Sequence, residues 1–388
     1  MTTLMTSLME PDNNVTFGAV TSNQSLKPHE HGNMTPAETL DELNARYATT
    51  LIPFTILLGL FGVIGIVGNI LVFIVYGWGQ KFKDKKFRYY VLTLAVIDFV
   101  TCLTLIPAEM VKHMSYFNFT EHVLCKMKCF FNVFAASSAS YCLTLIAIDR
   151  FIMICHPLLF AKVPAFSNGL ARKLCFLMII LAVLTAIPSA ILCGITPHVI
   201  RDVTGHVITV SLCESDPYYA HSVQRYVYRF ILCGLQTLVS LVMIVLYAKI
   251  GHAVMKVIKL RDEKENELKT RSMQSLHRHY TEREHHCIEH PDVTNCRHHH
   301  HTHMPSNIKL LFLVTLVFIV TFLFYMVLSW VDQTTLTPVQ FLFFSMAFRL
   351  YFVHSIINPI LYMKMDKYFR KRCMELVRSI FRCRSNRY

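Results

Sequence analysis

Charged side chains are scarce in this sequence: only 16% of its 388 residues are charged, whereas 53% are hydrophobic. A soluble globular domain carries about 25% charged residues, so a soluble fold is disfavoured. Acidic residues are scarcer than basic ones: there are 25 Asp and Glu against 38 Lys and Arg, which gives a net charge of +13. A basic soluble chain would suggest a nucleic-acid partner. The apolar surplus instead favours a membrane protein with its basic residues on one side of the bilayer and no bound nucleic acid.

Charge is almost absent from seven long stretches, each comparable with the 20 or so apolar residues that a helix needs to cross a bilayer. They lie between residues 46 and 81, 88 and 109, 128 and 149, 173 and 201, 229 and 249, 309 and 332, and 332 and 364. Only Asp98 interrupts the second stretch and only Arg349 the seventh. We therefore predict an all-α membrane protein: a bundle of seven transmembrane helices over residues 50–363, then an amphipathic eighth helix and short tail over residues 364–388.

The basic residues predict the orientation of the chain. The connections after the first, third and fifth stretches, together with the C-terminal tail, hold 29 of the 38 Lys and Arg residues. The positive-inside rule places these segments in the cytoplasm and the N-terminus outside the cell. Four glycosylation sequons fall on the predicted outer side. They begin at Asn14, Asn23, Asn33 and Asn118.

Two polar segments are predicted to be disordered. Residues 1–49 form the glycosylated extracellular N-terminus, which lacks the apolar core of a cleavable signal peptide. Residues from about 260 to 303 form a charged cytoplasmic loop that ends in a histidine tract. Such tracts can bind zinc, so a metal-ion transporter is an alternative function, although the spacing fits no closed four-ligand site.

Cysteines on the outer side are the candidates for a disulfide, because thiols in the spans or the cytoplasm stay reduced. Cys125 lies at the outer mouth of the third span and Cys213 lies in the second outer loop, and we predict that these two are bonded. Cys129, one helical turn deeper, and Cys193 are the alternative partners. β-Branched runs on both sides of Gly205 predict a β-hairpin in the same loop.

The C-terminal tail repeats apolar or sulfur side chains at helical spacing, with basic side chains between them. The repeated positions are Phe369, Cys373, Leu376, Val377 and Ile380. This pattern predicts an amphipathic helix on the inner leaflet, in contact with membrane lipid. Cys373 and Cys383 are candidate palmitoylation sites.

Ionisable residues are costly in lipid, so they indicate functional sites. Asp98 is the only charge in the middle of the second span, and Asn69 and Asn358 are its expected polar neighbours. Pro359 follows Asn358 and lacks an N–H donor, which predicts a helix kink there. The pattern is equally typical of a hydrated hinge and of a static polar network.

An acid and a base, Asp149 and Arg150, end the third span at the cytoplasmic face. They could be merely interfacial. Arg150 could also exchange partners when helices shift, with Tyr247 and Tyr362 as its second partners.

In their order along the chain, these motifs resemble the rhodopsin-like (class A) G-protein-coupled receptors, over residues 50–383. The shared motifs are Gly68-Asn69, Leu94-Ala-Val-Ile-Asp98, Cys125, Asp149-Arg150-Phe151, Cys155-His156-Pro157-Leu158, Asn358-Pro359-Ile360-Leu361-Tyr362 and Phe369. Each motif alone is modest, but their order on seven spans is very specific.

The resemblance also exposes departures in the spans that the family uses as hinges. After Phe318, the position of the family's toggle Trp holds Phe322, and Phe324 and Val239 stand where spans six and five usually have Pro. Without these prolines, the sequence does not predict whether span six moves outward on activation. A receptor-like protein that does not signal is therefore a further alternative. No acid stands at the inner end of span six, so the resting ion pair of Arg150 is expected with Asp149.

A sodium ion near Asp98 is the one candidate cofactor that the resemblance implies. Ala139 replaces a Ser that the family often has there, and His354 replaces an Asn or Ser. Because of these two replacements, the sequence does not decide whether sodium binds there.

Two ligand classes are disfavoured because the residues that bind them are missing. Asn132 stands where amine receptors carry Asp, and Phe352 stands where opsins carry the Lys that holds retinal. The expected hairpin and the long N-terminus resemble peptide receptors. Candidate ligand contacts lie at the outer ends of the spans, at Glu109, Asn132, Arg225, Arg229, Tyr325 and Arg349.

The resemblance implies a plasma-membrane receptor without a catalytic site, whose extracellular ligand is a neuropeptide. Its cytoplasmic partners would be a heterotrimeric G protein and an arrestin. The residues that the resemblance assigns to activation are Asp149, Arg150, Tyr247, Phe318, Phe322, Asn358, Pro359 and Tyr362.

Overall fold

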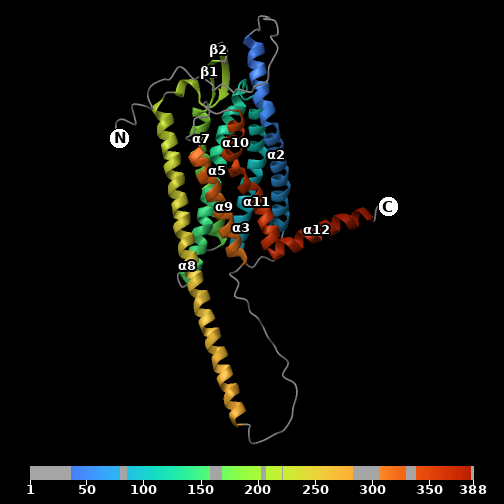
Figure 1. Cartoon of the computed structure of the whole chain (residues 1–388), viewed down its shortest axis with the longest axis vertical. Helices are drawn as coiled ribbons and strands as arrows, with labels where there is room; N and C mark the ends of the chain where they lie inside the picture. The colour runs from blue at the N-terminus through green and yellow to red at the C-terminus, as the bar shows by residue number, and fades with distance from the viewer. Residues whose placement is uncertain are drawn as a thin grey trace, which may run out of the picture.

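Seven helical crossings build an elongated bundle (Figure 1) in the computed structural model, which describes residues 36–78, 85–157, 168–201, 207–220, 222–282, 306–328 and 338–385. Five crossings are single helices: α2 (Pro36–Trp78), α5 (His122–Cys155), α7 (Asn168–Leu192), α8 (Val223–Glu282) and α9 (Ser306–Leu328). Two are composite: the second joins α3 (Lys85–Val100), η1 (Thr101–Leu105) and α4 (Ile106–Met114), and the last joins α10 (Pro338–Phe348), η5 (Leu350–Phe352) and α11 (Val353–Met365). Within the described residues, 6 crossings are long and apolar enough to span a membrane, and α9 supplies the shorter apolar stretch Phe312–Leu328. The prediction of a seven-helix membrane bundle is confirmed.

A two-stranded antiparallel sheet covers one end of the bundle, which we call the hairpin end. In it β1 (Ile195–Arg201) pairs with β2 (Val207–Cys213), with Ile195 opposite Cys213. The predicted hairpin is thereby confirmed. α12 (Lys367–Ser385) leaves the bundle sideways at the opposite end, which we call the α12 end (Figure 1).

Apolar side chains face outward along the helices as well as inward. On α2, for example, Ile56, Leu60, Val63 and Val67 are all exposed and recur at helical spacing. An exposed apolar stripe of this length is unfavourable in water. It fits a surface that is covered by lipid tails.

Glycine lets α2 approach α11 closely. A Cβ atom at Gly68 would lie 2.8 Å from two ring carbons of Pro359, so no larger residue fits without a shift. The next residue, Asn69, is fully buried and donates a hydrogen bond of 3.1 Å to the backbone oxygen of Ser355 on α11. The Gly68-Asn69 motif therefore joins the first and last crossings.

A π turn interrupts the second crossing at η1. Its wider turn rotates the following helix by about 100° relative to an unbroken α-helix. Pro107 follows in the first turn of α4, where its missing N–H is tolerated. The interruption helps to set which face of α4 turns toward the interior, and Glu109 and His113 are the polar side chains buried there.

Two helices extend into segments that were predicted to be disordered. α8 continues to Glu282, so residues 260–282 are helical, because helix-forming residues fill the stretch and Glu265 pairs with Lys269 one turn later at 2.8 Å. α2 already begins at Pro36, so residues 36–49 are helical too, and Tyr47 is buried in a hairpin-end cluster. The remainder of both predicted segments, 1–35 and 283–303, lies outside the described residues.

Candidate functional site

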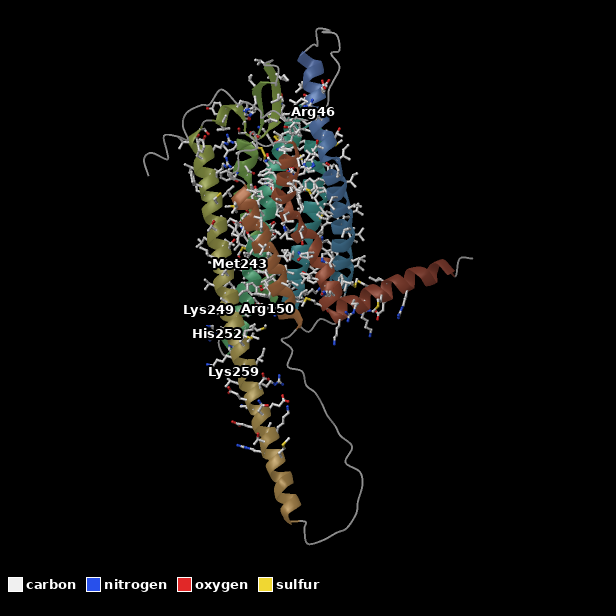
Figure 2. All side chains as sticks on the ribbon, in the orientation of Figure 1. Arg46, Arg150, Met243, Lys249, His252 and Lys259 are labelled. Atoms are coloured by element: carbon white, nitrogen blue, oxygen red, sulfur yellow. A yellow bond between two sulfur atoms is a disulfide. The ribbon has the colours of Figure 1, made fainter. Side chains whose placement is uncertain are left out.

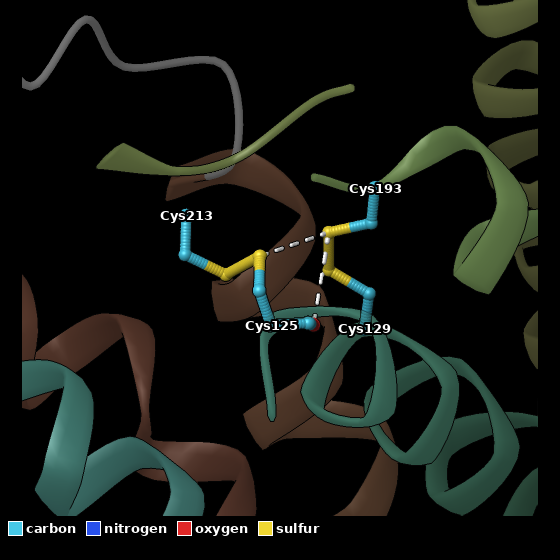
Figure 3. Close-up of side chains that lie close together, drawn as sticks. All are labelled: Cys125, Cys129, Cys193 and Cys213. Carbon is cyan, nitrogen blue, oxygen red and sulfur yellow. Dashed lines mark hydrogen bonds between the residues drawn. A yellow bond between two sulfur atoms is a disulfide. The ribbon is translucent and has the colours of Figure 1, made fainter. Parts of the chain in front are cut away.

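Four cysteines lie together beneath the hairpin and form two disulfides (Figure 3). Cys125 on α5 is bonded to Cys213 at the end of β2, as predicted. Cys129, one turn deeper on α5, is bonded to Cys193. The two residues that the sequence left as alternative partners thus pair with each other. Both bonds hold the second outer loop of the predicted topology to α5.

The hairpin also packs on the connection between α4 and α5. Ser211 donates to the Phe117 carbonyl at 2.8 Å, and the Phe119 N–H donates to the Ser211 carbonyl at 3.0 Å. Apolar side chains of β2 pack there with Tyr47 of α2 and Phe341 of α10. The hairpin therefore covers the α2 and α10 side of the hairpin end.

A cluster of charged side chains is buried just below this cap. Glu109 of α4 accepts a hydrogen bond of 2.9 Å from Lys128 Nζ of α5 through Oε1. Its Oε2 lies 3.0 Å from both Nε and Nη2 of Arg349, which follows α10. Arg349 Nη1 also donates to the Ser345 carbonyl at 3.3 Å. This ion cluster joins three crossings, and Glu109 and Arg349 are only 5% and 8% exposed.

A cavity of about 180 Å³ lies between α5, α8, α9 and η5. Most of its wall is apolar, and Phe322 of α9 is part of it. Six polar side chains also line it, namely Asn132, Ser137, Arg229, Gln236, Tyr325 and Tyr351. A mostly apolar cavity with a few polar groups has the composition of a small-ligand site.

Five of the six predicted ligand contacts fall into two groups. Asn132, Arg229 and Tyr325 line the cavity, whereas Glu109 and Arg349 bind each other beside it. Asn132 Oδ1 accepts a hydrogen bond of 2.8 Å from the Tyr351 hydroxyl, and its Nδ2 donates to Tyr325 at 3.4 Å.

Arg225, the sixth predicted contact, donates to the Ala220 carbonyl at 3.1 Å and is not part of the cavity wall. Gln236, Lys128 and Tyr351 are not among the contacts predicted from the sequence, although Gln236 and Tyr351 line the cavity and Lys128 binds Glu109. The helical spacing of Arg229 and Gln236, seven residues apart on α8, could have indicated Gln236, because such residues share a helix face.

Aromatic contacts lead from the cavity to the middle of the bundle. The rings of Phe322 and Phe318 stack with centroids 5.8 Å apart, and Phe318 meets the imidazole of His354 edge-on at 5.5 Å. His354 Nε2 lies 3.7 Å from Asp98 Oδ1. Side chains on α9 and α11 thus connect the cavity to the carboxylate on α3.

Asp98 is fully buried, and Asn358 Nδ2 donates to its Oδ2 at 2.6 Å. Among the described residues, one oxygen each of Asp98, Asn69 and Asn358 is buried without a hydrogen-bond partner. A hard cation takes oxygen ligands, so these three residues fit the sodium ion that the resemblance implies. Ala139 adds no hydroxyl to them.

Arg150 lies toward the α12 end, near the level of Lys249 on α8 (Figure 2). It is buried, its Nε is 3.8 Å from Asp149 Oδ2, and its guanidinium lies 5.8 Å from the centre of the Phe87 ring. The ion pair expected with Asp149 is therefore present.

The two tyrosines proposed as second partners of Arg150 are both buried. The Tyr247 hydroxyl of α8 accepts a hydrogen bond of 3.0 Å from Thr315 of α9. The Tyr362 hydroxyl has no hydrogen-bond partner among the residues that the structure describes. Tyr362 packs against Tyr76, whose hydroxyl donates to Asp366 Oδ2 at 2.5 Å.

The predicted modification sites differ in exposure. Asn118 is exposed at the hairpin end, as an acceptor of a glycan must be, while Asn14, Asn23 and Asn33 lie outside the described residues. Cys373 on α12 is buried against the bundle, and this burial raises the pKa of its thiol. The Cys383 side chain lies outside the described part of the chain. Glycosylation and palmitoylation stay predictions.

A metal site in the middle of the bundle would need several His, Cys, Asp or Glu side chains close together. In the described ranges, the disulfide-bonded cysteines are the only group of three or more His, Cys, Asp or Glu with closely spaced ligand atoms. The histidine tract lies outside those ranges.

The chain is similar to known membrane receptors. A family model described as "7 transmembrane receptor (rhodopsin family)" matches residues 68–362. The allatostatin-A receptor of Bombyx mori is 28% identical over 162 residues, which cover 39% of this chain and 41% of that receptor. Human olfactory receptor 8B3 is 26% identical over 154 residues, covering 40% and 44%. Human olfactory receptor 8D1 is 24% identical over 233 residues, covering 59% and 73%. The chain thus spans less than half the length of the first two relatives.

Proposed function

Because the chain belongs to the rhodopsin family of seven-transmembrane receptors, we propose that it is a plasma-membrane receptor that activates heterotrimeric G proteins when an extracellular peptide binds. The hairpin end would face outward, because the exposed sequon at Asn118 lies there and the basic residues of α12 and of the last turns of α8 lie at the other end. The α12 end would face the cytoplasm.

The observation that carries this proposal is the cavity with its aromatic connection to Asp98. A ligand in the cavity would touch Phe322, whose ring stacks on Phe318. A shift of these rings would be felt at His354 and so at Asp98 and Asn358. A ligand changes the conformation of a receptor only by binding one helix arrangement better than another. The stacked rings of Phe322 and Phe318 are the contact through which the cavity wall reaches the middle of the bundle.

At the α12 end, activation would release Arg150 from its place beside Asp149. Phe87 and Asp149 hold the guanidinium inside the bundle in this arrangement. The Thr315–Tyr247 hydrogen bond joins α9 to α8 at the same end. A relative movement of α8 and α9 would break that bond and open a space for part of the G protein, with an arrestin as a competing partner.

A peptide is proposed as the ligand for two reasons. The relative named for allatostatin A is a peptide receptor by its name, although the match is at low identity. The loop that carries the hairpin is fixed by two disulfides to α5, which also supplies part of the cavity wall. A loop that is already held in place loses little conformational entropy of its own when a peptide binds.

The test is a screen of cells that express the full chain against a library of synthetic neuropeptides, read by calcium and by cyclic AMP. Arg150→Ala should abolish the response to any active peptide without removing the protein from the cell surface. Arg46→Ala, an exposed arginine at the hairpin end, is the control and should respond normally. An unchanged response of Arg150→Ala would refute the role of this residue.

The screen also separates the proposal from a receptor-like protein that does not signal. Such a protein would give no response to any peptide, or the same high response with and without peptides. Activation by small volatile compounds alone, suggested by the names of the olfactory relatives, would refute the peptide ligand but retain the receptor.

A further inference from the structure

The polar groups of the cavity are unequal in charge and in hydrogen-bond role. Arg229 is exposed in the cavity wall, and no carboxylate among the described residues lies within ion-pair distance of it. No acidic side chain is part of the wall. The nearby carboxylate of Glu109 already binds both Lys128 and Arg349, so it cannot balance Arg229. The cavity therefore carries one uncompensated positive charge.

Gln236 adds an unused donor. Its Oε1 accepts a hydrogen bond of 3.2 Å from Ser140, but its Nε2 is buried without a partner in the described part of the chain. The side chain is 7% exposed and lines the cavity. An unpaired buried donor is unfavourable and rare, so a ligand atom that accepts a hydrogen bond is the natural partner of Gln236 Nε2.

Tyr325 supplies a third donor. Its oxygen accepts from Asn132 Nδ2 at 3.4 Å, and no acceptor for its own proton is found among the described residues. Arg229, Gln236 and Tyr325 come from α8 and α9 and line the same cavity. Together they offer one cation and two further donors to a bound molecule.

We propose that this cavity recognises a carboxylate attached to an apolar body. Arginine is the side chain best suited to a carboxylate, because its planar N–H groups match the two oxygens. The apolar wall beside Phe322 takes the hydrophobic part of the ligand. This proposal rests on the receptor function above and adds the chemical class of the ligand group that enters the bundle. The carboxylate comes from a peptide C-terminus, an acidic peptide side chain or a free organic acid.

Binding to the purified full chain in phosphatidylcholine nanodiscs tests the proposal without any signalling partner. The probes are 4-phenylbutyrate, 4-phenylbutyramide and 4-phenylbutylamine, which share one apolar body and differ in the head group. Saturation-transfer NMR should show that the acid binds about tenfold or more tightly than the amide, because a charged hydrogen bond is lost in the amide. The amine should bind most weakly, because it meets Arg229.

Substitutions in the cavity wall test whether the preference for the acid over the amide arises in the cavity. Arg229→Gln should bring the acid to the affinity of the amide, whereas Arg46→Gln, the same change at an exposed arginine outside the cavity wall, should keep the preference. Gln236→Leu should weaken binding of the acid while the empty protein keeps or gains thermal stability, because an unpaired donor is removed. Ser140 retains its bond of 2.9 Å to the Ser137 carbonyl in that variant.

Peptide probes identify the source of the carboxylate. Ala-Ala-Ala-Phe is compared with its C-terminal amide, and acetyl-Ala-Asp-Ala-Phe-amide with its Asn counterpart. A preference in the first pair indicates a C-terminus, one in the second an acidic side chain, and one confined to 4-phenylbutyrate a free acid.

Equal binding of the three phenyl probes, tighter binding of the amine, no binding of the acid, or an acid preference that survives Arg229→Gln would overturn the proposal. A failure of G-protein activation would leave these binding results unchanged, so the two proposals can fail separately.

Discussion

The second crossing carries two buried carboxylates that are stabilised in opposite ways. Glu109, near the hairpin end, binds two cationic side chains from two other crossings. Asp98, about three turns away, has an amide donor from Asn358 and an imidazole 3.7 Å away, with buried oxygens around it that lack partners among the described residues. One carboxylate is compensated by fixed charges, and the other is held by an uncharged amide donor.

The contrast suggests a division of labour between the two regions. Separating the ions around Glu109 would leave buried charges uncompensated, which is costly. That region is therefore expected to stay fixed and to hold the cavity wall in place. Around Asp98, neutral groups can exchange hydrogen bonds at lower cost, so this is the region expected to rearrange when a ligand binds.

The largest effect is expected at the ion cluster. Glu109→Gln should lower the free energy of unfolding by about 3–5 kcal/mol, because the buried Arg349 and the partly buried Lys128 would be left without a counter-charge. Unfolding in mixtures of SDS and mild detergent measures this change.

Glu121→Gln is the matched control, because Glu121 is exposed and its side chain makes no cap hydrogen bond. It should change stability by about 0.5 kcal/mol or less. Equal losses of unfolding free energy in the two variants would show that the ion cluster does not stabilise the fold more than an exposed glutamate does.

A smaller loss of stability is expected at the close contact between α2 and α11, which depends on packing rather than on charge. Gly68→Ala places a Cβ against the ring of Pro359 and should cost about 1–3 kcal/mol, the usual range for overpacking. Gly77→Ala meets no atom within 4 Å and should be neutral or slightly stabilising. If both variants behaved alike, the close approach of α2 to α11 would not be what positions Asn69.

The smallest effect is expected at Asp98. Asp98→Asn keeps an oxygen that can accept from Asn358, so stability should change by about 1 kcal/mol or less. Replacing sodium by potassium at equal ionic strength should lower the thermal stability of the wild-type protein and leave that of Asp98→Asn unchanged. A sodium effect of equal size in both proteins would exclude a sodium site at Asp98.

Sequence reasoning reached those features that depend on local pattern. Charge-free runs predict the seven crossings, and β-branched runs around Gly205 predict the hairpin. The scarcity of polar residues inside the spans makes Asn358 an expected neighbour of Asp98. The extent of α8 was missed, because charged residues that suggest disorder are also good helix formers.

Distant pairs whose members belong to no recognisable motif were beyond the sequence. Glu109 and Arg349 are 240 residues apart, and nothing in the local pattern says that each is the other's partner. Both were therefore predicted as ligand contacts, as was Arg229, which does line the cavity. The unpaired Nε2 of Gln236 could be recognised only once its neighbours were placed.

If a ligand at the hairpin end controls Arg150 at the α12 end, the two ends must be separable by mutation. Nucleotide exchange on purified heterotrimeric G proteins, catalysed by the full chain in nanodiscs with an active peptide from the screen, measures this. Arg150→Ala should bind the peptide normally but lose about tenfold or more of the stimulated exchange. Stimulated exchange at the wild-type rate in Arg150→Ala would contradict it.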